Sequence, residues 1–316
     1  MYYPCFHGKT FELVTIRAMA SLLADKQFVP VIEPVRKQLG YLQRALKAVC
    51  DAGGSATLIV NPYHGDHQQD GAPINTLLKQ DFKGAQSFSA GILLRRDMTV
   101  DQVMAYCDQY ADRDLALIHA GFNEPKTLAA RLCKWSGLTH VFLEHHAKLL
   151  YQKHFDESKT INQNKHILVR DGFKRLRNAD YKKEDEFSDL HVTYRGLGMD
   201  GFGDFLTVGD VYSEGEGPAY AVAIHLTYID PNKDHVMGIR HFVSDNNTSP
   251  IDPAGKFAEA LKHLIATLES KTSHLLETEA IKEFRAMHAN GHFPGLGYVK
   301  KLSMQHHIET LANFLA

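Results

Sequence analysis

The stretch QFVPVIEPVRKQLGYLQRALKAVCDAGGSATLIVN, residues 27–61, has the pattern of one strand–helix–strand unit. Its first apolar run ends in Glu33 and its second ends in Asn61. Between the runs, apolar residues recur at helical spacing, and Gly53-Gly54 follows, as is common where a helix ends. Each predicted strand of this unit therefore finishes on a polar side chain.

The same pattern recurs along the chain. Short apolar runs alternate with helical periodicity, which predicts parallel strands with helices outside them. Near-continuous apolar runs are typical of strands that are buried on both faces. About eight such units favour a closed (β/α)8 TIM-like barrel; an open doubly wound sheet is the alternative. The predicted strands are 2–6, 28–32, 56–60, 88–94, 115–118, 140–143, 167–169 and 220–228.

The chain shows no linker that would separate two halves, so we predict a single α/β domain over 1–316. The alternation stops at 173–217, which is charged and then rich in glycine, and we interpret this range as a loop excursion, or lid, after strand seven. An extra strand at 237–243 is expected to pair with 220–228. Residues 253–316 are predicted to form outer helices and a C-terminal cap.

Composition excludes several classes of protein. The formal net charge is -2, so there is no global basic field for nucleic acid. The four cysteines form no CxxC pair, which excludes a zinc ribbon and favours free thiols in a reducing, cytoplasmic setting. No run of about 18 apolar residues appears, so we expect no membrane span.

In a barrel the downstream ends of all strands open on one mouth, where such folds keep their active sites. Polar residues follow nearly every predicted strand. Carboxylates and imidazoles can transfer protons or bind cations, and guanidinium groups bind phosphate or carboxylate. The predicted catalytic residues are Glu33, His119, Glu144 and Asp171. The predicted substrate-binding residues are Lys9, Asn61, Arg95, Arg170 and His225.

Two alternatives stay open at these strand ends. The basic residues could form ion pairs with Glu33, Glu144 and Asp171 instead of binding an anionic ligand. The cofactor is unknown, and a divalent metal is one candidate, although the sequence contains neither HxH nor HExxH. We interpret the sequence HGDH at 64–67 as a solvated loop.

The opening of the chain resembles the phage beta-protein family and its bacterial relatives. The likeness lies in Tyr3-Pro4, Gly8-Lys9 and Glu12-Leu13, then in Ile32-Glu33-Pro34, Gly203-Asp204-Phe205 and the alternating run 219–228. His7 stands where those proteins commonly have arginine. The resemblance implies a barrel-like α/β fold and a phage or bacterial setting, and supplies no catalytic residues.

Three functions are compatible with these patterns, and the sequence does not decide whether the protein is an enzyme. The first is a barrel protein that binds a small anionic ligand at its mouth, as a hydrolase using acid–base or metal-assisted chemistry. The second is a non-catalytic interaction protein in phage conflict or defence, with a protein partner. The third is nucleic-acid binding through the basic stretch 165–183.

Overall fold

The computed structural model describes residues 1–85, 87–214, 220–270 and 273–316. Contacts between Cα atoms divide the chain into two compact units. The first unit is Met1–Arg170 with Thr193–Asp204, and the second is Asp171–Val192 with Phe205–Ala316. The organisation of 1–316 as one domain stays a prediction, and each unit is described by itself.

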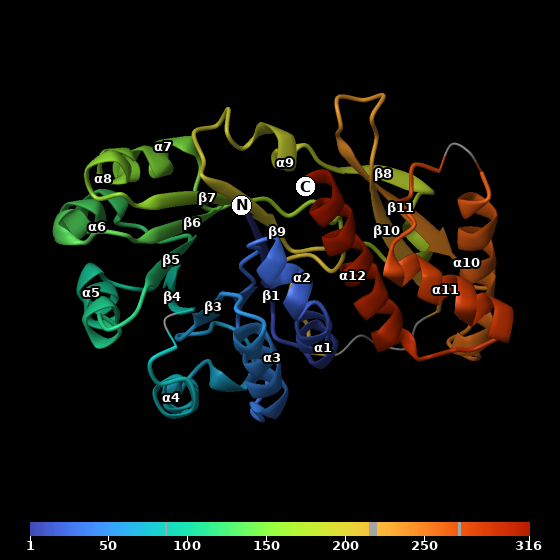
Figure 1. Cartoon of the computed structure of the whole chain (residues 1–316), viewed down its shortest axis with the longest axis horizontal. Coiled ribbons are helices and arrows are strands. Elements are labelled where there is room, and N and C mark those ends of the chain that lie inside the picture. The colour runs from blue at the N-terminus through green and yellow to red at the C-terminus, as the bar shows by residue number, and fades with distance from the viewer. Residues whose placement is uncertain (86, 215–219, 271–272) are drawn as a thin grey trace. The chain divides into compact units, whose positions relative to one another are not determined.

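The first unit is a closed barrel of parallel strands in the order β1-β2-β3-β4-β5-β6-β7-β9 (Figure 1). This confirms the predicted TIM-like fold against the open sheet. The barrel strands are β1 (Tyr2–Phe6), β2 (Val31–Ile32), β3 (Ala56–Ile59), β4 (Phe88–Arg95), β5 (Leu115–Ala120), β6 (Thr139–Leu143), β7 (Lys165–Val169) and β9 (Gly201–Asp204).

Helices follow the barrel strands, and the longer ones bury one face. In α3, for example, Leu42, Ala45, Leu46 and Val49 are buried, which is the spacing of one helical face. The helical segments of this unit are α1 (Thr10–Ala18), α2 (Ala20–Asp25), α3 (Gly40–Asp51), η1 (Gly65–His67), α4 (Ala72–Thr76), η2 (Leu77–Asp81), α5 (Val100–Gln109), α6 (Pro125–Arg131), η3 (Leu132–Lys134), α7 (Leu149–Gln152), η4 (Lys153–Phe155) and α8 (Asp156–Ile161).

The eighth barrel strand is β9, and the prediction of 220–228 for that position was wrong. Strand β9 closes the barrel by pairing with both β1 and β7. Its sequence, GFGD, lacks the apolar run of a strand, because the chains approach too closely for side chains there. A Cβ on Gly201 would lie 2.7 Å from the Met1 carbonyl oxygen, and a Cβ on Gly203 would clash with the Tyr3 carbonyl.

The second unit is a sheet of antiparallel strands packed with helices. Its strand order is β10-β11-β8 among the described residues, which confirms the predicted pairing of 237–243 with the strand before it. Helices α10, α11 and α12 bury their apolar faces in one cluster with β10 and β11. The interpretation of 253–316 as outer helices and a C-terminal cap stays a prediction. The elements are η5 (Asn178–Asp180), β8 (Glu184–Ser188), β10 (Ala223–Ile229), β11 (Met237–Val243), α10 (Pro253–Leu268), α11 (Glu279–Asn290) and α12 (Leu296–Phe314), and α9 (Leu190–Thr193) spans the boundary between the units.

The range 173–217, predicted as a loop excursion, therefore contains two strands, β8 and β9. Its last three residues, 215–217, lie outside the described residues, as does residue 219 of the run that resembles the phage family. In the part of the chain that the structure describes, no helix is both long and apolar enough to cross a membrane.

Candidate metal centre at the barrel mouth

Three side chains, one from each of the first three strand–helix repeats, meet at the downstream end of the barrel. The Nδ1 atom of His7 lies 3.1 Å from Oε2 of Glu33, and Nδ1 of His64 lies 2.9 Å from the same oxygen. His7 and Glu33 are buried, and His64 is partly buried. Because a carboxylate only accepts hydrogen bonds, both imidazoles donate to one oxygen atom.

The other carboxylate oxygen of Glu33 is fixed by the main chain. Oε1 accepts hydrogen bonds from the backbone N–H groups of Tyr63 and His64, at 2.7 and 2.9 Å. Burial alone would raise the pKa of Glu33, but the hydrogen bonds from His64 and His7 outweigh it and hold this pKa well below its usual range. Glu33 is therefore an ionised carboxylate whose orientation is set before any ligand arrives.

Strand pairing places the first two members side by side. Phe6 is paired with Ile32, and the ladder continues when the Glu33 N–H donates to the Phe6 carbonyl at 2.8 Å. His7 and Glu33 are the next residues of the two strands. The chain turns immediately afterwards at Gly8, whose φ is +60° and whose Cβ position would lie only 2.7 Å from the Glu33 carbonyl oxygen.

The third member, His64, arrives on the loop after β3. Gly65 has φ +73°, and a Cβ there would clash with the Val35 carbonyl, so only glycine lets the loop pass this close to the chain after β2. Asp66 attaches the loop to that chain, since its N–H donates to the Val35 carbonyl at 3.0 Å and its carboxylate accepts from the Lys37 N–H at 2.7 Å.

This arrangement has the chemistry of a metal site. Each of the three residues offers one ligand atom, and these atoms all lie within 4.8 Å of one another. Among the described residues, this is the one group of at least three His, Cys, Asp or Glu ligands at such spacing. Two histidines and one glutamate are the protein ligands of several catalytic zinc sites, which keep a further position open for water or substrate. The backbone hydrogen bonds to Oε1 would orient the carboxylate as outer-shell partners do in such sites.

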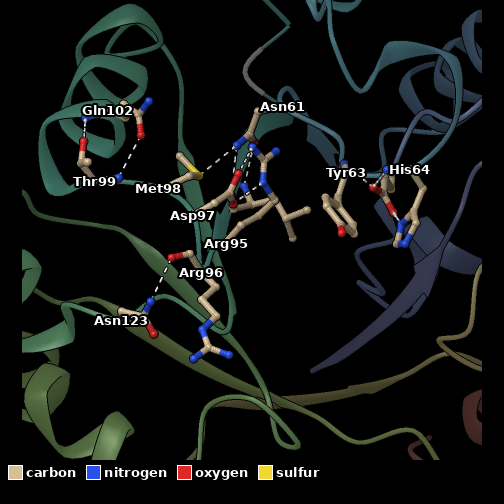
Figure 2. Close-up of polar contacts among 12 residues, drawn as sticks. Asn61, Tyr63, His64, Arg95, Arg96, Asp97, Met98, Thr99, Gln102 and Asn123 are labelled. Carbon is tan, nitrogen blue, oxygen red and sulfur yellow. Dashed lines mark hydrogen bonds and ion pairs between the residues drawn. The ribbon is translucent and has the colours of Figure 1, made fainter.

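Arg95 lies beside this cluster. Its guanidinium carbon is 5.7 Å from the centre of the Tyr63 ring, and the Tyr63 ring is 5.0 Å from that of His64. Arg95 also donates to the carboxylate of Asp97, from Nε at 3.1 Å and from Nη2 at 3.4 Å, which lowers the pKa of Asp97. Figure 2 shows the Arg95 side chain beside Asp97, with Tyr63 and His64 on the neighbouring loop.

Asn61, predicted to bind substrate, has a structural contact in this fold. Its amide bridges β3 to β4 by donating to the Leu93 carbonyl at 3.0 Å and accepting from the Leu93 N–H at 2.8 Å (Figure 2). Both groups of Leu93 are thereby satisfied beyond the end of β3, where the backbone ladder cannot reach.

Replacing Asn61 with alanine is therefore expected to destabilise the barrel unit by about 2–4 kcal/mol, because two buried backbone groups lose their partner. Asn123→Ala is the matched control, since the Asn123 amide donates one exposed hydrogen bond to the Arg96 carbonyl. Urea unfolding followed by the fluorescence of Trp135, the single tryptophan of the chain, would measure both changes. Equal effects for the two variants would contradict this role of Asn61.

Glu144 and Arg170, also predicted at the mouth, form an ion pair with each other. Arg170 donates to both carboxylate oxygens, from Nε at 2.6 Å and from Nη2 at 2.8 Å. This is the two-point geometry in which guanidinium binds carboxylate best. The alternative left open by the sequence, ion pairing between strand ends, is the one realised for these two residues.

His119, predicted as catalytic, lies on the outer face of the barrel. Its ring packs on Phe155 of η4, with centroids 4.7 Å apart, and its Nδ1 atom lies 2.8 Å from the Tyr151 hydroxyl of α7. The expectation that it faces the mouth was wrong. Side chains alternate between the two faces of β5, and that of His119 is on the face that packs against the helices. His119 is part of a buried histidine cluster, which we define as His119, His140 and His166.

Of the remaining predicted residues, two belong to the second unit and one to the first. Asp171 belongs to the second unit, where its carboxylate accepts from the backbone N–H groups of Phe173 and Asp210. His225 lies on β10 in the same unit, and its Nδ1 atom is 2.7 Å from Nδ1 of His241, so it does not end a barrel strand. Lys9 directly precedes α1 in the first unit, and its carbonyl accepts from the Leu13 N–H.

The sequence indicated two metal-ligand candidates only weakly. His7 was recognised as a polar residue after strand one but was left out of the predicted catalytic set. His64 was assigned to a solvated loop, because nothing in HGDH shows that Gly65 permits close packing against Val35. The available signal was a histidine directly after the first strand, a glutamate directly after the second, and a histidine four residues after the third.

Comparisons with known proteins add the following. No model of a known protein family matches the chain, and no curated protein matches it, so the resemblance to the phage beta-protein family stays a prediction. Among solved structures, the chain is similar to a mutant morphinone reductase in complex with tetrahydroNAD, with a TM-score of 0.38 and 8% sequence identity. That match covers 64% of this chain and 82% of the other. The assignment of the barrel accordingly rests on the closed strand order of the chain itself.

Proposed function

We propose that the protein is a metal-dependent hydrolase whose centre consists of His7, Glu33 and His64. The observation that carries the proposal is the convergence of three ligand atoms within 4.8 Å at the downstream end of a barrel. That end is where barrel enzymes hold their active sites.

The type of ligand favours a divalent transition metal. Imidazole nitrogens suit zinc, iron and related ions, whereas magnesium and calcium prefer oxygen ligands throughout. Two histidines and one carboxylate serve both zinc hydrolases and iron oxygenases. We propose hydrolysis because it needs no oxidant and no further cofactor.

A bound zinc ion would supply a water molecule that is deprotonated near neutral pH. In the reaction, a water oxygen forms a bond to the phosphorus or carbon atom of an ester, and the bond from that atom to the leaving oxygen breaks. The proton released by the water ends on the leaving oxygen, so atoms and charge balance without any change of oxidation state. His7, Glu33 and His64 hold the ion, and the main chain at Tyr63 keeps Glu33 oriented.

Metal titration tests the centre directly. The wild-type protein is expected to bind one Zn²⁺ or Co²⁺ ion, and His7→Ala and His64→Ala are each expected to lower the affinity by about a hundredfold or more, since even outer-shell partners contribute about 10- to 100-fold. His154→Ala, at an exposed histidine of the same unit, is the control and should bind as the wild type does. Isothermal titration calorimetry and the visible spectrum of the cobalt form would measure the effect.

Hydrolysis requires a separate assay. The zinc-loaded protein is expected to hydrolyse simple activated esters such as 4-nitrophenyl phosphate or 4-nitrophenyl acetate, and the His7 and His64 variants should lose that activity together with the metal. A wild-type protein that binds no metal would contradict the centre. A protein that binds zinc but hydrolyses neither phosphate nor carboxylate esters would contradict the hydrolase.

A further inference from the structure

The side chain of Arg95, at the end of β4, faces the barrel interior. Side chains alternate between the two faces of a strand. A Cβ on Gly91 of β4 would contact the side chains of Thr57 and Ile118, and Ile118 points opposite to its neighbour His119, which faces the outer helices. Gly91 therefore faces the barrel interior, and so does Arg95, four residues further along the same strand.

The backbone of Arg95 is held in this orientation. It is the last residue of β4, paired with Ala120 and bridged to Gly121. Arg96, the next residue, directs its side chain away from Arg95 (Figure 2). Arg95 is thus the β4 side chain that reaches the mouth.

The contacts of Arg95 differ from those of Arg170. Arg170 is bound at two points by Glu144, with one hydrogen bond as short as 2.6 Å. Arg95 donates two longer hydrogen bonds, and its partner Asp97 has a side chain that is 70% exposed. Exposed ion pairs of this kind contribute little net stability, so a competing anion can share or replace Asp97 at low cost.

Tyr63 connects Arg95 to the metal centre. Its ring lies under the guanidinium, its backbone N–H holds Glu33, and its ring also contacts His64. A ligand atom bound to the centre and an anionic group bound to Arg95 would be separated by one aromatic side chain. With one anionic ligand, Glu33, and two neutral imidazoles, a divalent ion at the centre would also keep a net positive charge.

We infer that the substrate of the centre carries an anionic group, a phosphate or carboxylate, which Arg95 binds next to the metal. This inference deepens the proposed function and rests on it. Guanidinium offers phosphate and carboxylate two parallel N–H donors, which lysine cannot do. Arg95 is on this inference a substrate-binding residue, while His7, Glu33 and His64 hold the metal.

Inorganic phosphate is the probe for this site, with acetate in parallel to distinguish the two anion classes. Each would be titrated into the zinc-loaded protein at constant ionic strength. Arg95→Gln is expected to weaken binding of the preferred anion by about tenfold to a hundredfold, the size of a lost charge-assisted interaction. Arg95→Lys should recover part of the loss, and Asp97→Asn should strengthen binding, because Arg95 then has no competing carboxylate.

Arg44→Gln is the matched control. Arg44 also lies over a tyrosine ring, with its guanidinium carbon 4.5 Å from the centre of Tyr41, but on the exposed face of helix α3. This variant should bind phosphate as the wild type does. Zn²⁺ affinity should be unchanged in Arg95→Gln, which separates binding of the anion from support of the metal centre.

The results distinguish anion binding by Arg95 from the metal centre on which it rests. If zinc binds through His7, Glu33 and His64 but Arg95→Gln binds phosphate and acetate as the wild type does, the inference is overturned and the metal centre stands. The inference also fails if the zinc-loaded wild type binds neither anion, or if Arg95→Gln loses zinc as well. If the wild-type protein binds no zinc, the proposed function fails, and the inference fails with it.

Discussion

Replacing Glu33 with alanine is expected to destabilise the barrel unit by about 3–5 kcal/mol, because two backbone N–H groups and two imidazoles lose a charged hydrogen-bond acceptor. Glu33 is 6% exposed and accepts hydrogen bonds from two backbone N–H groups and two imidazoles. Without the carboxylate, the loop of Tyr63 and His64 loses the acceptor that attaches it to β2. The same variant is expected to lose metal binding.

Two further variants make this prediction specific. Glu33→Gln keeps an oxygen that can accept from Tyr63 and His64, but presents an amide N–H₂ to the two imidazoles, so its loss of stability should be smaller than that of Glu33→Ala. Glu144→Ala is the matched control. Glu144 accepts two hydrogen bonds from Arg170, but its side chain is 37% exposed. An exposed pair contributes about 0–1 kcal/mol. Urea unfolding followed by Trp135 fluorescence would contradict the prediction if Glu33→Ala and Glu144→Ala were equally destabilised.

The barrel unit is expected to be sensitive to acid because of its buried histidine cluster. Burial is the largest cause that lowers the pKa of His140 to about 3 and that of His166 to about 4, and it lowers the pKa of His119 well below its ordinary value. Charge on neighbouring histidines lowers the pKa of His119 and His140 further, and the charge of Lys159 lowers that of His166. The Nε2 atoms of His140 and His166 are buried and have no hydrogen-bond partner among the described residues.

The direction of the pH dependence follows from which state, folded or unfolded, binds more protons. Each of these histidines has a lower pKa in the folded protein than in the unfolded chain, whose value is about 6.5. Below that pH the unfolded state binds more protons, so stability falls as the pH falls from about 6.5 towards 4. At pH 5 the loss is about 2 kcal/mol for each histidine whose folded pKa lies below 5. Two or three such residues would remove much of the roughly 5–15 kcal/mol that stabilises an ordinary domain.

Unfolding by urea at several pH values between 7.5 and 4.5 would measure this dependence. Trp135 lies in the barrel unit, so its fluorescence reports on that unit. His166→Phe should reduce the slope by about 1.4 kcal/mol per pH unit, the effect of one proton. His166 is chosen because its ring already packs against Phe142, and because its charged neighbours Lys159, Asp156 and Asp200 stay in place. His154→Gln, at an exposed histidine, should leave the slope unchanged, and a wild-type stability that is flat between pH 6.5 and 4.5 would refute the prediction.

Much of the barrel could be predicted from the sequence because its information is local. A strand buried on both faces needs a continuous apolar run, and the helix after it needs an apolar stripe, so 28–32, 56–60 and 88–94 were recognisable without knowledge of their partners. Strand β9 was missed because its contribution to closure depends on glycine, which has no side chain to form a pattern. The more apolar run that was chosen instead, 220–228, pairs with β11 in the second unit.

The candidate site was predicted in part for a related reason. A polar residue after a strand can be read from the sequence, which identified Glu33, Asn61 and Arg95. The direction in which that side chain points depends on the alternation of side chains along the strand and on the loop that follows. His119 and Glu33 have the same relation to their strands in the sequence, yet one faces the outer helices and the other the two imidazoles.

The sequence by itself therefore determined a repeated strand–helix order and a series of ionisable groups at the strand ends, since both follow from the periodicity of burial along the chain. Only the tertiary structure decided which of those groups meet. His64 reaches Glu33 because Gly65 allows its loop to pack against Val35. Arg170, which follows β7, forms an ion pair with Glu144, which follows β6. Such contacts join residues more than twenty positions apart, and no local pattern of the chain records which distant partner will fill a given space.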